Sequence, residues 1–266
     1  SLKRDSKGNF KKSTGIRSRK SSIYKPGQKD VFKISRSKFS NFMDCKRCFY
    51  LDRVKGLQEP GMPGWALNTT VDDLLKKEFD YYRKKKEPHP IFYEYNLNYI
   101  PFDHENIDTW RNSLTGGISY LDADTNIILQ GGIDDVWFNL DTQEIVVCDY
   151  KAQSTSYEVE REYYLNGVYH QGYKMQMDIY VYILKQMNFK VSNISYFMVC
   201  NAIKSAERFD AKMNFDIKLI DYEVNTDWIK EKILDMKRIM DSNEIPERTA
   251  HCENCAYLAQ GSKLSS

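Results

Sequence analysis

Two charged residues, Asp149 and Lys151, interrupt the apolar stretch IVVCDYKA at residues 145–152. Residues two apart in a β-strand face the same side, so Val147, Asp149 and Lys151 are predicted to lie in one row. Burying such charges costs several kcal/mol unless a partner or a metal ion compensates them. A salt bridge at the end of a strand is the ordinary interpretation of this row, and a metal site is the alternative.

A second acidic pair, Asp134 and Asp135, follows QGG one strand earlier in the chain. Glycines such as Gly131 and Gly132 weaken a strand and often mark the close approach of a ligand or of another backbone. The apolar runs on either side of NLDTQE predict an antiparallel hairpin, which would bring Asp134 toward Asp149. Such carboxylates suit Mg²⁺, and a lysine beside that ion can orient or deprotonate a water and stabilise charge on phosphorus.

The order of these motifs resembles that of the PD-(D/E)XK nuclease superfamily. GGID followed by VVCDYK is similar to its split acid and D-x-K signature, which maps onto Asp134, Asp149 and Lys151. QMDIY is similar to the Q-x-x-x-Y element of the RecB-like branch, which maps onto Gln176 and Tyr180, four residues apart on a predicted helix. The resemblance implies an α/β (mixed α+β) fold with a restriction-endonuclease-like core, in which helices flank a central mixed sheet.

The third metal ligand is less clear from the sequence. Members of this branch often carry a His in the helix before the hairpin, and NTTVDDLL has Asp72 at the corresponding position. Aspartate is a competent oxygen donor for Mg²⁺ or Mn²⁺. Glu78 on the same predicted helix is the rival, and either acid could be an ordinary surface residue. The expected metal ligands are therefore Asp72, Asp134 and Asp149.

Four of the six cysteines form two C-x-x-C pairs, CKRC and CENC, which contain Cys45, Cys48, Cys252 and Cys255. Cys148 and Cys200 lie inside strand patterns and are expected to be core thiols. In an intracellular protein, two such pairs predict a four-thiolate metal site that ties the N-terminal and C-terminal regions together. Four thiolates suit Zn²⁺ and equally a [4Fe-4S] cluster.

Both cysteine segments, ISRSKFSNFMDCKRCFY and CENCAY, resemble those of nucleases related to AddB and of the CRISPR-associated RecB-like exonucleases. This resemblance implies the [4Fe-4S] cluster. The chain departs from the family pattern because it divides its cysteines two and two rather than one and three. That departure keeps Zn²⁺ as the alternative.

The basic residues concentrate at the start of the chain. Residues 1–29 contain ten Lys or Arg and a single acid, Asp5, which gives this segment a net charge of +9. With few apolar residues it is predicted to form a flexible basic arm over residues 1–30, which could bind a polyanion or remain a solvated tail. The RecB-like resemblance spans most of residues 34–258 and implies that residues 31–266 form one nuclease domain that includes the cysteine site. With 41% hydrophobic and 14% aromatic residues, the chain can build a core.

Apolar spacing predicts the helices. The first follows a Ser cap within residues 30–57, and a second over 66–86 places Leu67, Val71, Leu74, Leu75 and Tyr82 on its apolar face. One long helix is predicted over 163–189 and a closing helix over 225–242. No apolar run reaches the roughly 20 residues of a membrane span, and the N-terminus lacks a signal-peptide pattern, so a soluble, intracellular and cytoplasmic protein is expected.

The resemblance implies an enzyme, a Mg²⁺- or Mn²⁺-dependent deoxyribonuclease that acts as an exonuclease on single-stranded DNA or DNA ends. The expected catalytic residues are Asp134, Asp149, Lys151, Gln176 and Tyr180. DNA is the expected partner, and no membrane is. A non-cleaving nucleic-acid-binding module of the same fold and a restriction-type endonuclease are the alternatives, although no target-recognition insert is visible.

Overall fold

The computed structural model describes residues 2–62 and 64–265. The chain divides into two compact units. The first contains the described parts of residues 1–64 together with 121–129 and 228–266, and the second contains 65–120 and 130–227. The candidate carboxylates belong to the second unit and the two C-x-x-C pairs to the first.

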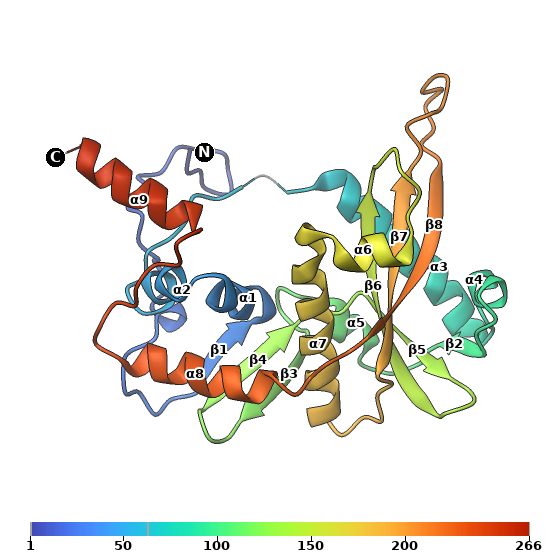
Figure 1. Cartoon of the computed structure of the whole chain (residues 1–266), viewed down its shortest axis with the longest axis horizontal. Helices are drawn as coiled ribbons and strands as arrows, with labels where there is room; N and C mark the ends of the chain where they lie inside the picture. The colour runs from blue at the N-terminus through green and yellow to red at the C-terminus, as the bar shows by residue number, and fades with distance from the viewer. Residues whose placement is uncertain (1, 63, 266) are drawn as a thin grey trace. The chain divides into compact units, whose positions relative to one another are not determined.

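The second unit is built on a mixed five-stranded sheet of order β2-β5-β6-β7-β8 (Figure 1). Its strands are β2 (Tyr99–Pro101), β5 (Asp135–Asn139), β6 (Glu144–Gln153), β7 (Ile194–Ala202) and β8 (Phe215–Glu223). β6 pairs antiparallel with β5, as the predicted hairpin requires, and parallel with β7. Residues 145–150 of β6 are buried without interruption, which is typical of a central strand covered on both faces.

Helices cover both faces of this sheet, as predicted (Figure 1). α3 (Ala66–Lys85) packs Leu75 and Phe79 into a core that includes Val146 and Cys148 of β6. Strand alternation turns Asp149 to the other face, where it contacts Gln176 of α7 (Gln171–Gln186). The shorter helices of this unit are α4 (Pro90–Glu94), α5 (Ile107–Arg111) and α6 (Arg161–Asn166). No helix in the described part of the chain is both long and apolar enough to cross a membrane.

The first unit is mainly helical. It contains η1 (Lys20–Ser22), β1 (Phe32–Ser35), α1 (Arg36–Asp44), α2 (Lys46–Arg53), α8 (Ile229–Asp241) and α9 (Glu253–Leu264). Ser35 caps α1 by accepting a hydrogen bond from the Lys38 backbone N–H at 3.3 Å, which confirms the predicted Ser cap. Phe39, Phe42 and Phe49 are fully buried and form much of its core. β1 also belongs to a three-stranded sheet of order β1-β4-β3, with β3 (Ile118–Asp122) and β4 (Ile127–Gly131).

Parts of the predicted basic arm make defined contacts within the first unit. Tyr24 is 2% exposed, and its hydroxyl donates to Asp241 Oδ1 at 2.6 Å. Arg17 forms an ion pair with Asp52. The division into an arm over residues 1–30 and one domain over 31–266, and the binding of a polyanion by the arm, stay predictions.

The long helix predicted over residues 163–189 is wrong, because the structure contains α6, the short 3-10 helix η2 (Val168–His170) and α7 instead. Gly167 lies at the break. The ring nitrogen Nδ1 of His170 and the carbonyl oxygen of Tyr164 are 2.7 Å apart, so the imidazole engages a carbonyl that a continuous helix would use. A glycine with low helix propensity and a competing side chain together end the helix.

The predicted apolar face of α3 is also wrong in part. Leu67 and Leu74 are 69% and 57% exposed, whereas Leu75, Phe79 and Arg83 are buried. The buried face follows Leu75, Phe79 and Arg83, and it includes an arginine that an apolar pattern does not reveal. Ion pairing of the Arg83 guanidinium, described below with the carboxylates, makes its burial possible.

Gly131 and Gly132 mark the close approach of another backbone. A Cβ on Gly132 would lie 2.7 Å from Cβ of Ser113, and the carbonyl oxygen of Gly131 would lie 2.5 Å from a Cβ on Gly117. Gly117 has a φ of +93°, which also favours glycine. Gly117 and Gly132 therefore let the loop at residues 112–117 pack directly against the end of β4 and the residue that follows it.

We expect Gly132→Ala to lower the free energy of unfolding by roughly 1–3 kcal/mol, because the new methyl group meets the backbone of Ser113 as well as its Cβ. Gly172→Ala is the matched control. It lies in the first turn of α7 with nothing within 4 Å of the new Cβ, so it should be neutral or stabilising. Chemical denaturation measures both variants, and equal stabilities would contradict the close approach.

Candidate active site and cysteine cluster

A pocket of about 290 Å³ opens in the second unit beside the ends of β5 and β6. Its polar lining includes Asp72 from α3, Asp134 from the residue before β5, Lys151 from β6 and Tyr173 from α7. The pocket therefore collects side chains from four elements that are far apart in sequence. Two of these residues, Asp134 and Lys151, are sequence-predicted catalytic residues, and Asp72 is a predicted metal ligand.

Asp134 is held at the pocket by the neighbouring strand. Its Oδ2 accepts a hydrogen bond from the Tyr150 backbone N–H at 2.9 Å, which joins the start of β5 to β6. Burial, reinforced by the negative charge of Asp149, raises the pKa of Asp134 to about 7. Asp134 and Asp149 are therefore a natural site for a cation, because a bound cation would offset both the cost of burying their charges and the repulsion between them.

Asp149 is fully buried and contacts Gln176 and Lys151. Its Oδ1 accepts from the Gln176 side-chain amide at 2.7 Å, and the same amide nitrogen donates to the Tyr180 hydroxyl at 3.1 Å. Lys151 forms an ion pair with Asp149, and its ammonium lies 4.4 Å from the centroid of the Tyr173 ring. The structure thus brings together Asp149, Lys151, Gln176 and Tyr180, with Gln176 and Tyr180 buried behind the carboxylate.

Lys151 remains a cation in this setting. Burial alone would lower the pKa of its ammonium, but the charges of Asp149 and Asp134 outweigh burial and raise the pKa above its ordinary value. The side chain is 15% exposed and lines the pocket. The arrangement therefore presents a fixed positive charge beside the two carboxylates.

Asp72, rather than Glu78, lies in the pocket with Asp134. Asp72 Oδ2 accepts from Lys76 Nζ at 2.6 Å, whereas Oδ1 is buried and has no hydrogen-bond partner among the described residues. Burial and the charge of Asp134 raise the pKa of Asp72. Glu78 is 56% exposed and pairs with His89 Nε2 at 2.9 Å. A buried carboxylate oxygen without a hydrogen-bond donor fits a cation ligand, so Asp72, Asp134 and Asp149 suit a hard divalent ion.

Asp135 points to the side of the sheet opposite to Asp149 and is fully buried. Its Oδ1 is engaged by Arg83 and by Arg111, the latter at 2.7 Å, and its Oδ2 accepts from the Tyr150 hydroxyl at 2.9 Å. Arg111 Nε also donates to the backbone carbonyl of Asp134 at 3.1 Å. Sequence reasoning missed this network. The available signal was the Asp134–Asp135 pair itself, because strand alternation requires one of the two to face the core.

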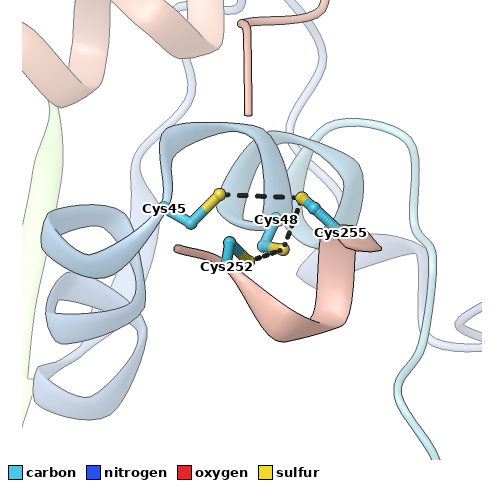
Figure 2. Close-up of side chains that lie close together, drawn as sticks. All are labelled: Cys45, Cys48, Cys252 and Cys255. Atoms are coloured by element: carbon cyan, nitrogen blue, oxygen red, sulfur yellow. Dashed lines mark hydrogen bonds between the residues drawn. The ribbon is translucent and has the colours of Figure 1, made fainter. Parts of the chain in front are cut away.

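The four cysteines of the C-x-x-C pairs converge in the first unit (Figure 2). All four sulfurs lie within 4.8 Å of one another. The measured Sγ–Sγ distances are 3.8 Å for Cys45 and Cys255, 3.4 Å for Cys48 and Cys252, and 3.3 Å for Cys48 and Cys255. The cluster can therefore hold a metal ion, as the paired spacing predicts.

Each C-x-x-C pair begins at the start of a helix. Cys45 precedes α2 and Cys252 precedes α9 as the N-cap residue. Although burial opposes ionisation, hydrogen bonds that include one from the Cys48 backbone N–H lower the pKa of the Cys45 thiol to about 6. Burial, together with the neighbouring sulfurs, raises the pKa of Cys48. Ionisation of all four sulfurs side by side would therefore require a bound cation.

The sequence model of the PD-(D/E)XK nuclease superfamily matches residues 62–260. The chain belongs to this superfamily. The matched region contains every candidate carboxylate, Lys151 and the CENC pair, whereas Cys45 and Cys48 precede it. As a PD-(D/E)XK nuclease, the protein belongs to enzymes that use divalent metal ions and act on nucleic acid.

One solved structure that the chain matches is a crystal structure from Eubacterium rectale of a protein provisionally designated an exonuclease. The sequences are 15% identical, the TM-score is 0.43, and the match covers 85% of this chain and 87% of the other. A search of the curated proteins gives no match.

We expect Arg111→Met to lower the free energy of unfolding by about 3 kcal/mol, because it removes one of two arginines from a fully buried carboxylate. Arg161→Met is the matched control. That arginine pairs with Asp221 at the surface and is 44% exposed, so its loss should change stability by less than about 1 kcal/mol. If chemical denaturation shows the same small effect for both variants, the Asp135 network does not support this part of the fold.

Proposed function

We propose that the protein is a Mg²⁺- or Mn²⁺-dependent deoxyribonuclease that hydrolyses phosphodiester bonds. The supporting observation is the convergence of Asp72, Asp134 and Lys151 on one pocket, with Asp149 paired to Lys151. Asp72, Asp134 and Asp149 would hold the ion. When bound, the ion supplies Lewis acidity and lowers the pKa of a water molecule.

Lys151 is proposed to act as an electrostatic and positioning group. Its ammonium lies beside Asp149 and over the Tyr173 ring, so its position is determined from two sides. A fixed cation at the pocket wall can orient the attacking water and stabilise the negative charge that develops on the phosphoryl oxygens. Asp149, two residues earlier on the same face of β6, forms an ion pair with this ammonium and so connects it to the proposed metal ligands.

Gln176 and Tyr180 are proposed to position Asp149 and, through it, the scissile strand. The Gln176 amide nitrogen donates to both Asp149 Oδ1 and the Tyr180 hydroxyl. Because all three side chains are buried, this chain of hydrogen bonds fixes the orientation of the carboxylate without exposing either residue to solvent. Correct orientation of catalytic groups is worth a large share of the barrier in reactions of this kind.

Single-stranded DNA, or DNA with free ends, is the proposed substrate. Three tyrosines between β6 and α7, Tyr157, Tyr163 and Tyr169, are 83%, 84% and 91% exposed. This segment connects Lys151 to the helix that carries Tyr173 and Gln176. Exposed aromatic rings can stack on unpaired bases, each stack contributing about 1–3 kcal/mol, and these rings support a single-stranded or frayed substrate.

We expect Asp149→Asn and Lys151→Ala each to reduce cleavage by about 100-fold or more while leaving DNA affinity largely unchanged, because phosphate contacts elsewhere dominate affinity. The assay uses labelled single-stranded and double-stranded DNA with Mg²⁺, with Mn²⁺ and with chelator. Asp141→Asn, in the exposed turn between β5 and β6, is the control and should cleave normally. Wild-type turnover in Asp149→Asn would overturn the assignment, and cleavage in chelator would overturn the metal requirement.

For the cysteine cluster we propose one structural Zn²⁺ ion. Zn–S bonds of about 2.3 Å at tetrahedral angles separate the sulfurs by roughly 3.8 Å. The measured distances of 3.3–3.8 Å and the limit of 4.8 Å support this arrangement. The four thiolates of a [4Fe-4S] cluster each bind a different iron, so they stand around the whole cluster and lie farther apart. The sulfur spacing thus favours the Zn²⁺ alternative over the cluster that the family resemblance implies.

Purified protein is expected to be colourless and to contain about one zinc per chain. Cys252→Ser should release the metal and lower the melting temperature by roughly 5 °C or more, because the site closes a loop of about 200 residues. Cys200→Ala, a buried thiol outside the cluster, is the control and should keep the zinc. Brown protein with about four irons per chain after anaerobic purification would contradict this proposal.

A further inference from the structure

Lys76, a residue not singled out by the sequence motifs, contacts the carboxylates of the candidate active site. Its Nζ lies 2.6 Å from Asp72 Oδ2 and 4.0 Å from Asp134 Oδ1. The lysine side chain is 19% exposed, and those of Asp72 and Asp134 are 28% and 24% exposed. The ammonium therefore lies between two acids that come from different elements, α3 and the segment before β5.

The ordinary explanation of the pair is a helix salt bridge, since Lys76 follows Asp72 by four residues. The first unit contains such a pair, Lys237 and Asp241, with the same 2.6 Å separation on α8. Lys76 differs from that pair in two respects. It also reaches a second carboxylate from another element, and both of its partners line the pocket that contains Lys151.

We propose that Lys76 is a positioning residue that acts as the internal counter-cation of the metal site and sets its affinity for divalent ions. This inference rests on the proposed function. Asp72 and Asp134 carry like charges, line the same pocket and repel each other. The ammonium offsets that repulsion and keeps Asp72 directed toward Asp134.

The same contact opposes metal binding. Lys76 pairs with Oδ2 of Asp72 and leaves Oδ1 to an ion, but an ion held by Asp72 and Asp134 must tolerate a positive charge a few ångströms away. Like charges at that distance interact strongly in a partly buried site and are weakly screened by salt. Lys76 thus preorganises two ligands and weakens the binding of the ion, which favours reversible metal exchange.

The test measures Mn²⁺ binding directly, by calorimetry and by the electron paramagnetic resonance signal of free Mn²⁺ at pH 8. Lys76→Met removes the charge and keeps the length of the side chain. We expect it to tighten Mn²⁺ binding at least tenfold, whereas Lys76→Arg retains the charge and should bind within about twofold of the wild type. Lys237→Met is the matched control, because it breaks an equivalent helix pair outside the pocket and should leave Mn²⁺ binding unchanged.

The outcomes separate this inference from the proposed function. If wild-type protein binds Mn²⁺ and Asp149→Asn abolishes that binding, but Lys76→Met changes it by less than twofold, Lys76 is only a helix partner and the inference is overturned. If the wild type does not bind Mn²⁺, or if Asp149→Asn binds it as tightly as the wild type does, the proposed function and the inference fail together. Circular dichroism melting checks the fold of each variant, and Lys76→Gln replaces Lys76→Met if the latter does not fold.

Discussion

The burial of two carboxylates on adjacent strands determines how the second unit is organised. Asp135 and Asp149 are both fully buried, and strand alternation sends them to opposite faces of the sheet. An unpaired carboxylate in either place would cost several kcal/mol, so each requires a cation in contact. Arg83 and Arg111 supply it for Asp135, and Lys151 supplies it for Asp149. The helices that carry the arginines are therefore held against the sheet by electrostatics as well as by apolar packing.

The two carboxylates differ in what surrounds them. The described partners of Asp135, namely Arg83, Arg111 and Tyr150, are all buried or nearly buried, so this network serves as a frame. Asp149 instead belongs to a group of charges that borders the pocket through Lys151 and Asp134. Arg111 links the frame to the site, because it binds the Asp135 side chain and the backbone carbonyl of Asp134 together. The Asp135 network therefore holds the backbone of the neighbouring residue, Asp134, in place beside the pocket.

Local rules predicted the parts of this arrangement that depend on the backbone alone. Alternation is sufficient to place Asp149 and Lys151 in one row, and the turn between β5 and β6 is sufficient to predict their hairpin. The arginine partners were not predictable, because a charged residue in a helix pattern indicates a surface until the packing of α3 and α5 on the sheet is known. The helix break at Gly167 depends on a side chain three residues later, which helical periodicity does not detect. The pairing of two C-x-x-C motifs was predictable, since identical spacing indicates a common ligand, although the helix α9 that carries the second motif was not.

The choice of metal at each site follows from the donor atoms rather than from the shape of the chain. Four sulfurs in the first unit form a soft, polarisable set that suits a borderline metal. The carboxylates of Asp72 and Asp134 line the pocket of the second unit and, in the proposed function, would form with Asp149 a hard set that suits Mg²⁺ or Mn²⁺. The two sites also differ in how the negative charge of their ligands is balanced. The cysteines start two helices, whose N-terminal N–H groups favour thiolates. The carboxylates have Lys76 and Lys151 in direct contact, so an ion that binds there must displace or tolerate protein cations. In the proposed function, an ion at the carboxylates would remain exchangeable, because Lys76 and Lys151 already place opposing charge at its site.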